Sequence, residues 1–203
     1  MTEIDIKITL IQFLMKSNPN AIIVSEMPFY FGERRADIVM LEGEIASVFE
    51  IKSASDTTVR LPDQIKSYLE FFDYCYVVGE KLNLNSIRKA SPPKVGLLTV
   101  DSSLVKVIRQ SQSFKRQNKL ALASVLPTAT LQQLANSTSI KSQFKLAGYV
   151  AKKLTLKKLK NISRNFLYKQ YESNFYLMKS ETTEIITADD LQTISRRSSV
   201  KLF

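Results

Sequence analysis

Residues 36–52, ADIVMLEGEIASVFEIK, decide the fold of this chain. Two apolar, β-branched runs flank a short polar segment that contains a glycine, and this pattern predicts an antiparallel hairpin. Side chains alternate between the two faces of a strand, so Glu50 and Lys52 share a face near the end of the second run. With a turn centred on Gly43-Glu44, Asp37 of the first run falls opposite Glu50, with the two Cβ atoms about 5 Å apart.

These three charged residues suggest a chemistry. Two carboxylates held this close repel each other unless a cation or a proton lies between them. Carboxylate oxygens suit Mg²⁺, and a neighbouring lysine can orient or deprotonate an attacking water or stabilise charge on a phosphorane. Asp37, Glu50 and Lys52 are therefore the minimal set for metal-assisted phosphodiester hydrolysis. A Glu-x-Lys pair on a strand also occurs at solvated edges or in cross-strand ion pairs, and this alternative stays open.

The rest of the first half alternates between helical and strand patterns. Apolar residues recur at helical spacing over 3–15, and Thr2 with Asp5 fits a capping box at the start of that helix. Pro62 suits the first position of a second helix. Strands are predicted at 22–29, 36–41, 45–52, 74–78, 95–100 and 104–108, with a loop over 80–94. The order predicts an α/β fold, in which helices flank a mixed sheet.

Charge divides the chain into two unequal parts. The 203 residues carry 29 Lys and Arg against 19 Asp and Glu, a net charge of +10. Residues 1–110 contain 13 basic and 14 acidic side chains, whereas residues 111–203 contain 16 and 5. We therefore interpret 1–110 as the core and 111–203 as a basic appended region. Such a region favours a polyanionic partner, nucleic acid before an anionic membrane, over a basic surface without a partner.

The composition excludes several function classes. The chain has no histidine, which removes Ser-His-Asp and Cys-His mechanisms and histidine-ligated metals. Its single cysteine, Cys75, excludes an internal disulfide framework, and the apolar strand around it predicts a core residue. No apolar run is long enough to span a membrane, and the acids in the first ten residues argue against a secretory signal.

Helical periodicity dominates the second half. Helices are predicted at 115–126, 128–136, 141–153, 155–171 and 187–195, and the uncharged stretch between Lys119 and Lys141 predicts burial. Candidates for phosphate contacts are the lysines Lys152, Lys153, Lys157, Lys158 and Lys160. A membrane-surface helix or a bundle with a solvated basic face is the alternative. We expect residues 180–203 to be partly disordered or to dock a partner.

Three motifs in order resemble those of a known superfamily. Arg35-Ala36-Asp37-Ile38-Val39, then Glu50-Ile51-Lys52, then Gln64-Ile65-Lys66-Ser67-Tyr68 resemble the PD-(D/E)XK, or restriction-endonuclease-like, nucleases. The resemblance covers residues 3–110 and continues weakly to about residue 171. It implies a restriction-endonuclease-like core with a basic α-helical region, as in small bacterial and phage members. Ala36 stands where the family name has proline, which is a common departure.

The resemblance implies a role for each matching residue. Asp37 and Glu50 are expected to bind a divalent metal ion, Mg²⁺ or Mn²⁺, and Lys52 to assist the attacking water. Gln64 and Tyr68 lie one helical turn apart and match a Gln-x-x-x-Tyr motif. In members with that motif, the glutamine lies beside the active site and the tyrosine supports it or contacts DNA.

Other residues are candidates for completing the site. In some members a glutamate of the first helix also binds the metal, and Glu3 is the only glutamate in that helix here. Glu26 on the first strand is the competing acid, with an exposed strand residue as its alternative interpretation. Bidentate phosphate contacts are expected from Arg34, Arg35 and Arg60. The alternative for these arginines is ion pairing with Glu33, Asp56 or Asp63.

These observations together predict a metal-dependent DNA endonuclease or nickase for repair, defence or mobile-element processing. The expected partner is nucleic acid, DNA before RNA, with no membrane, in the bacterial cytoplasm at the nucleoid. A homodimer or a partner protein stays open, because many nucleases of this fold cut duplexes as dimers. The alternatives are a catalytically silent DNA-binding or assembly subunit that retains the fold, and a regulator that acts through protein contacts.

Overall fold

A computed structural model describes residues 1–102, 104–182 and 185–198 of the chain. The fold is mixed α/β, as predicted, and it is built on one six-stranded sheet in the order β1-β2-β3-β4-β5-β6. The strands are β1 (Ile22–Phe29), β2 (Arg34–Glu42), β3 (Ile45–Lys52), β4 (Tyr74–Gly79), β5 (Gly96–Asp101) and β6 (Leu104–Arg109). The helices are α1 (Glu3–Ser17), α2 (Leu61–Leu69), α3 (Leu84–Ala90), α4 (Lys119–Ala123), α5 (Thr128–Ala135), α6 (Gln143–Lys153), α7 (Leu156–Glu181) and α8 (Ala188–Thr193).

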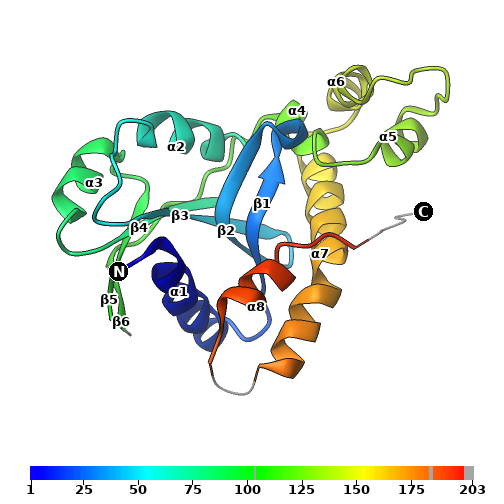
Figure 1. Cartoon of the computed structure of the whole chain (residues 1–203). Helices are drawn as coiled ribbons and strands as arrows, with labels where there is room; N and C mark the ends of the chain where they lie inside the picture. Colours follow the sequence, from blue (N-terminus) through cyan, green and yellow to red (C-terminus); the bar gives the residue numbers. More distant parts are fainter. Residues whose placement is uncertain (103, 183–184, 199–203) are drawn as a thin grey trace.

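The sheet has helices on both faces. In Figure 1, α1 and α8 lie on one side of it and α2 and α3 on the other, while α7 runs along the β1 edge. Strands β3, β4 and β5 run parallel, and the other neighbouring pairs are antiparallel. Strand β3 is therefore central and is buried from Ala46 to Ile51. Charged side chains at its end are consequently partly removed from water.

The predicted hairpin is confirmed in its register. Ile38 pairs with Phe49 and Glu42 with Ile45, and Gly43 adopts a left-handed φ of 56° in the turn. A left-handed residue is what the short hairpin turn needs, and glycine adopts it without steric cost. Extending the register by one position places Asp37 level with Glu50, as the alternation predicts.

Helix α1 begins as predicted. The Thr2 side chain accepts from the Asp5 backbone N–H at 3.2 Å, and the Asp5 carboxylate accepts from the Thr2 N–H at 2.8 Å. This capping box fixes the first turn of the helix. It thereby sets the position of Glu3, which lies in that turn.

Three predictions about the elements were wrong. The helix predicted over 115–126 covers only Lys119–Ala123, because the Asn118 side chain caps its start. Residues 80–94 contain α3 rather than being loop throughout, because Ile87 packs into the core although the surrounding sequence is polar. Helix α7 continues ten residues beyond the predicted end at 171, and Phe175 and Met178 bury its extra turns. The prediction of partial disorder over 180–203 falls partly on residues outside the described ranges. Within the described residues this segment forms α8, which buries Leu191, and Ile194 directly after the helix is buried as well.

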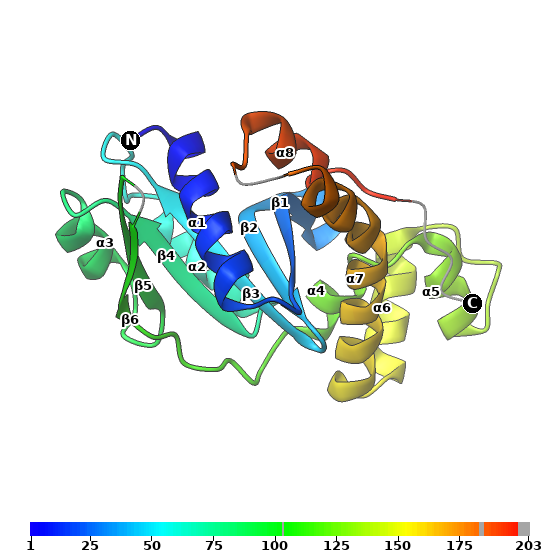
Figure 2. The same ribbon diagram turned by 90° about the horizontal axis from the view of Figure 1, so that it is seen from below.

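The basic helical region packs against the core. Its uncharged stretch is buried as predicted, through Ala121, Leu122, Ala123 and Leu131 among others. Asp73, which precedes β4, accepts from Arg164 and Lys160 of α7 and from the Gln117 side chain. Figure 2 shows α5, α6 and α7 grouped beside the β1 end of the sheet. Within the described ranges, every helix is too short or too polar to span a lipid bilayer.

Candidate active site

Asp37 lies where the sheet ladder is interrupted. The β1–β2 register pairs Ser25 with Ile38 and Met27 with Ala36, but skips Glu26 and Asp37. Glu26 has a φ of 53°, in the left-handed region that non-glycine residues rarely occupy. Such strained residues cost about 1–3 kcal/mol and persist where the surrounding structure holds them, often at functional sites. A carboxylate oxygen of Glu26 lies within 4.8 Å of one of Asp37 at this point.

Three carboxylates meet at this interruption. Oxygens of Glu3, Glu26 and Asp37 all lie within 4.8 Å of one another. The Nζ atom of Lys7, one turn after Glu3 on α1, lies 2.6 Å from the Glu3 carboxylate and also pairs with Glu26. Burial lowers the pKa of Lys7, but the hydrogen bonds that Lys7 donates to Glu26 and Glu3 outweigh burial and raise the pKa overall. Lys7 therefore remains charged and balances part of the negative charge.

A second group of polar side chains surrounds Glu50, whose side chain is almost fully buried. Its Oε1 accepts from Lys52 Nζ at 2.7 Å and from Gln64 Nε2 at 2.5 Å, and Lys52 also donates to Gln64 Oε1 at 3.1 Å. Tyr68 donates its hydroxyl to Oε2 of Glu50. Burial, followed by the charge of Glu50, raises the pKa of Tyr68, so its hydroxyl stays a donor. The structure thus brings together the predicted residues Glu50, Lys52, Gln64 and Tyr68.

Asp37 joins the two groups. Its Oδ2 accepts from the Ile51 backbone N–H at 2.8 Å, which holds the side chain next to β3. Burial, reinforced by the negative charge of Glu50, raises the pKa of Asp37 to about 7, against an ordinary value of 3.8. A carboxyl group this far from its ordinary pKa is typical of functional sites. A divalent cation beside it would favour the ionised form.

The shifted pKa predicts how stability depends on pH without metal. The folded state binds a proton at Asp37 up to about pH 7, whereas the unfolded chain loses it near pH 4. The free energy of unfolding in EDTA should therefore fall as the pH rises from 4 through 7. Urea unfolding at pH 5 and pH 8 measures this. Asp37→Asn should remove most of the difference, and an equal dependence in this variant would contradict the assignment.

The donor set fits a hard divalent cation. Oxygen ligands from several carboxylates are what Mg²⁺ and Mn²⁺ prefer. Glu3, Glu26 and Asp37 can supply these oxygens, and an accumulation of like charge is costly without a cation. Glu50 already accepts three hydrogen bonds, which leaves about one lone-pair position on its carboxylate. Glu3 and Glu26, which the sequence presented as competitors, lie together beside Asp37, so Glu26 is not an ordinary exposed strand residue.

Arginines line a cleft beside the Glu50 group. The cleft has a volume of about 440 Å³, and its lining includes Arg34, Arg35, Arg60, Gln64 and Tyr68. Arg35 pairs with Glu26 at 2.6 Å rather than with any of the acids suggested by the sequence, and its side chain is 71% exposed. Arg34 and Arg60 are exposed and form no ion pair with the residues that the structure describes.

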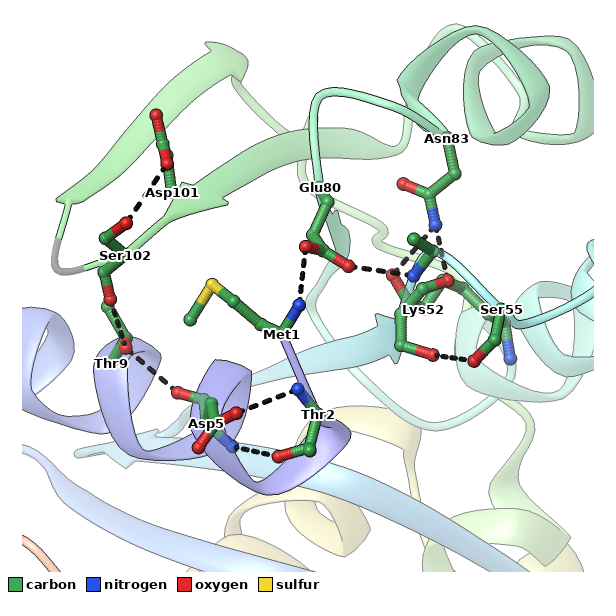
Figure 3. Close-up of polar contacts among 12 residues, drawn as sticks. Met1, Thr2, Asp5, Thr9, Lys52, Ser55, Glu80, Asn83, Asp101 and Ser102 are labelled. Carbon is green, nitrogen blue, oxygen red and sulfur yellow. Dashed lines mark hydrogen bonds and ion pairs between the residues drawn. The ribbon is translucent and has the colours of Figure 1, made fainter.

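The loop after Lys52 is held from behind by side chains that the sequence did not single out. Asn83 donates to the Lys52 and Ser53 carbonyls at 3.0 and 2.7 Å, and Glu80 accepts from the Ala54 N–H at 2.9 Å (Figure 3). Within the loop, Ser53 donates to Asp56 through both its N–H and its hydroxyl. These bonds fix the backbone from which the Lys52 side chain projects.

The five candidate lysines of the helical region have different surroundings. Lys152, Lys157 and Lys158 are exposed. Lys153 donates to the Leu134 carbonyl at 3.1 Å near the end of α5, and Lys160 pairs with Asp73. Lys153 and Lys160 thus have structural partners, and the other three are available for phosphate contacts.

Sequence inspection overlooked Lys7, which contacts two of the carboxylates. Its signal is the spacing Glu3-x-x-x-Lys7, which places both side chains on one face of α1. Such pairs are common on exposed helices and carry little information alone. Cys75 is a buried core residue as predicted, and burial, followed by the charge of Glu50, raises the pKa of its thiol.

The fold and site define a mixed α/β protein with a buried carboxylate and lysine cluster at its central strands, joined to a basic helical region. The chain matches the family described as Bacteriophage P4 protein cII over residues 1–195 and belongs to that family. It is 27% identical over 208 aligned positions to Protein cII of Enterobacteria phage P4, covering 97% of this chain and 78% of that protein.

A structural comparison also finds a protein of unknown function from Silicibacter pomeroyi. It matches with a TM-score of 0.43 and 18% identity, covering 57% of this chain and 75% of that one.

Proposed function

We propose that this protein is a metal-dependent nuclease of the PD-(D/E)XK superfamily that hydrolyses phosphodiester bonds in DNA. The observation that carries the proposal is the position of Asp37 between two polar groups. On one side lie the carboxylates of Glu3 and Glu26, and on the other lies Glu50 with Lys52. Carboxylates that could bind a divalent cation therefore lie next to Lys52 in a partly buried part of the protein.

The metal ion would be held by Glu3, Glu26 and Asp37, with Glu50 at the neighbouring position. When bound, a divalent cation supplies Lewis-acid polarisation of a phosphate and lowers the pKa of a bound water. The buried setting strengthens every charge interaction in the site relative to water. The side chain of Lys52 is 12% exposed, so only a small part of it is accessible to a bound substrate.

The protein's own side chains position the reacting groups. Gln64 and Glu50 hold the Lys52 ammonium through hydrogen bonds of 3.1 and 2.7 Å. A lysine held in this way can donate to the attacking water or stabilise charge that develops on the phosphorus centre. Tyr68 fixes the other oxygen of Glu50, which limits rotation of the carboxylate. Gln64 and Tyr68 are positioning residues in this scheme.

The basic surfaces supply substrate binding. Arg34, Arg35 and Arg60 lie in the cleft that begins at Gln64 and Tyr68, so a phosphate backbone in the cleft passes next to the site. Guanidinium groups suit phosphate because they donate two parallel hydrogen bonds. The exposed lysines Lys152, Lys157 and Lys158 add charge for contacts that depend on salt but not on sequence.

A catalytically silent nucleic-acid-binding subunit is the second candidate. The observation that favours it is Lys7, whose ammonium group pairs with Glu3 and Glu26. An internal cation of this kind balances the acid cluster without a metal. Such a subunit would retain the arginine cleft and bind nucleic acid without cutting it.

Cleavage of two DNA substrates tests the proposal. Supercoiled plasmid and a linear single strand are incubated with the full chain in Mg²⁺, in Mn²⁺ and in EDTA. We expect nicked or linear plasmid, or shortened single strands, with metal and none in EDTA. Binding of both substrates without cutting under every metal condition would contradict the nuclease and favour the silent subunit.

A further inference from the structure

An aromatic turn joins β1 to β2 beside the arginine cleft. Tyr30, Phe31 and Gly32 follow one another with φ values of 51°, 61° and 87°, all in the left-handed region. Glycine adopts this conformation freely, whereas each of the two aromatic residues is strained in it. Strain of this kind is retained only where the surroundings enforce it, and it often marks functional segments. The turn therefore holds two large rings in a fixed arrangement near the candidate site.

A third ring extends this pair onto the helical region. The Tyr30 and Phe31 ring centroids are 5.9 Å apart, and those of Phe31 and Phe144 are 5.4 Å apart. Phe144 lies in the first turn of α6, and 59% of its surface is exposed to solvent. We call Tyr30, Phe31 and Phe144 the ring row. Phe31 is half-buried in the middle of the ring row, and the exposed Phe144 lies at one end of it.

The ring row begins in a cleft that continues from the candidate site. Tyr30 lines a cleft of about 320 Å³ together with Arg34 and Lys66. The neighbouring 440 Å³ cleft shares Arg34 with it and also contains Gln64 and Tyr68, which contact Glu50. The two clefts therefore connect Gln64 and Tyr68 with Tyr30. Their lining combines the basic Arg34 and Lys66 with the acidic Asp63 and Glu70.

Basic side chains also flank the open end of the row. Lys141 and Lys145 are exposed on either side of Phe144 in the sequence. Aromatic rings alternating with cationic groups are the pattern by which proteins bind single-stranded nucleic acid, since bases stack on the rings and phosphates meet the charges. In a duplex the flat faces of the bases are already stacked on each other, so exposed rings gain little from it.

We propose that the ring row binds an unpaired nucleic-acid strand and leads it from the candidate active site across the β1–β2 turn to α6. This inference rests on the proposed function and specifies its substrate class as single-stranded, or as duplex with a single-stranded extension. At least one base stacks on the exposed ring of Phe144, while Arg34 and Lys66 bind phosphates near Tyr30. A close-packed core role does not explain an aromatic ring that is more than half exposed.

The absence of tryptophan from the chain gives a direct probe. Phe144→Trp, placed in an Asp37→Asn background with EDTA, introduces one indole and prevents cleavage. We expect a 20-nucleotide oligothymidine to quench its fluorescence, because stacking places a base against the indole. A 20-base-pair duplex should quench it much less. Tyr149→Trp, at an exposed tyrosine on another face of α6, is the matched control and should not respond.

Affinities measured by fluorescence anisotropy give a second readout. Phe144→Ala should weaken binding of the oligothymidine by roughly 5- to 150-fold, the loss of about one stacked base. Phe144→Leu keeps an apolar side chain without a flat ring and should not restore binding. Tyr149→Ala should bind like the unmodified chain, and circular dichroism checks that each variant is folded.

Two results would overturn the inference. One is that the chain binds single strand and duplex with equal affinity and that Phe144→Ala changes neither affinity. This result would not bear on the nuclease proposal, which the cleavage assay tests separately. The other is no binding of either nucleic acid at any salt concentration. The metal-dependent cleavage assay with unmodified protein then decides separately whether the nuclease proposal also fails.

Discussion

Lys52→Ala and Asp37→Asn are each expected to lower metal-dependent DNA cleavage about 100- to 1,000-fold. Removing a single preorganised group that stabilises transition-state charge typically costs 10²- to 10³-fold, and loss of an acid–base group costs a similar factor. Lys52 is held by Glu50 and Gln64, and Asp37 connects both polar groups of the site. The carboxylates of Glu3 and Glu26 stay in place in Asp37→Asn, but neither accepts the Ile51 N–H that holds Asp37 beside β3.

Single-turnover cleavage of plasmid by purified protein measures this loss. Lys89→Ala on α3 and Asp101→Asn at the end of β5 are matched controls, since both side chains are exposed and lie outside the site. Lys52→Arg separates charge from geometry, because a guanidinium group does not reproduce the compact ammonium. Activity within a few fold of the unmodified protein in folded Lys52→Ala would contradict the assigned role.

Asp73→Ala is expected to lower the free energy of unfolding by about 3–5 kcal/mol, the range for removing one partner of a buried ion pair. Asp73 is 3% exposed and Arg164 is 1% exposed, so the variant leaves a guanidinium group buried without its counter-charge. It also removes the acceptor for the Ala46 N–H and for the Gln117 side chain, both at 3.0 Å. Strand β3, the approach to β4 and helix α7 would all lose a shared contact.

Urea unfolding followed by circular dichroism tests the prediction, with a fall in Tm of about 6–20 °C as the thermal counterpart. Asp101→Ala, at an exposed position, should change stability by less than about 0.5 kcal/mol. Arg164→Met should cost less than Asp73→Ala. Among the described residues, Nε and Nη1 of the Arg164 guanidinium have no hydrogen-bond partner. Replacing the arginine therefore also removes two buried donors whose desolvation destabilises the fold. A loss below about 1 kcal/mol for Asp73→Ala would contradict the structural role.

The hairpin of β2 and β3 could be predicted because its determinants are local. Alternation of apolar residues specifies which side chains share a face, and Gly43 specifies the turn, so the register of Asp37 against Glu50 follows from counting. The spacing of Gln64 and Tyr68 likewise places both on one face of α2. Both side chains contact Glu50 in the structure, so this half of the candidate site could be predicted from the sequence.

The other half of the site could not be predicted in this way. Whether Glu3 or Glu26 lies beside Asp37 depends on the angle of α1 across the sheet and on the left-handed φ of Glu26. Neither property has a local signal, since both result from packing between elements. Lys7 was overlooked for the same reason, because its second partner comes from β1.

The strands, most of the helices, the α/β class, the division of charge and half of the candidate site could be predicted from the amino-acid order alone. Periodicity and composition are properties of neighbouring positions, and the chain carries them without folding. The tertiary structure decided which charges meet. In the folded chain, Lys160 and Arg164 form ion pairs with Asp73, whereas three other lysines of the helical region, Lys152, Lys157 and Lys158, are exposed. Phe31 and Phe144, more than a hundred residues apart in the sequence, lie in contact. Such contacts depend on packing of distant segments, because a charge or a ring interacts with what lies near it in space.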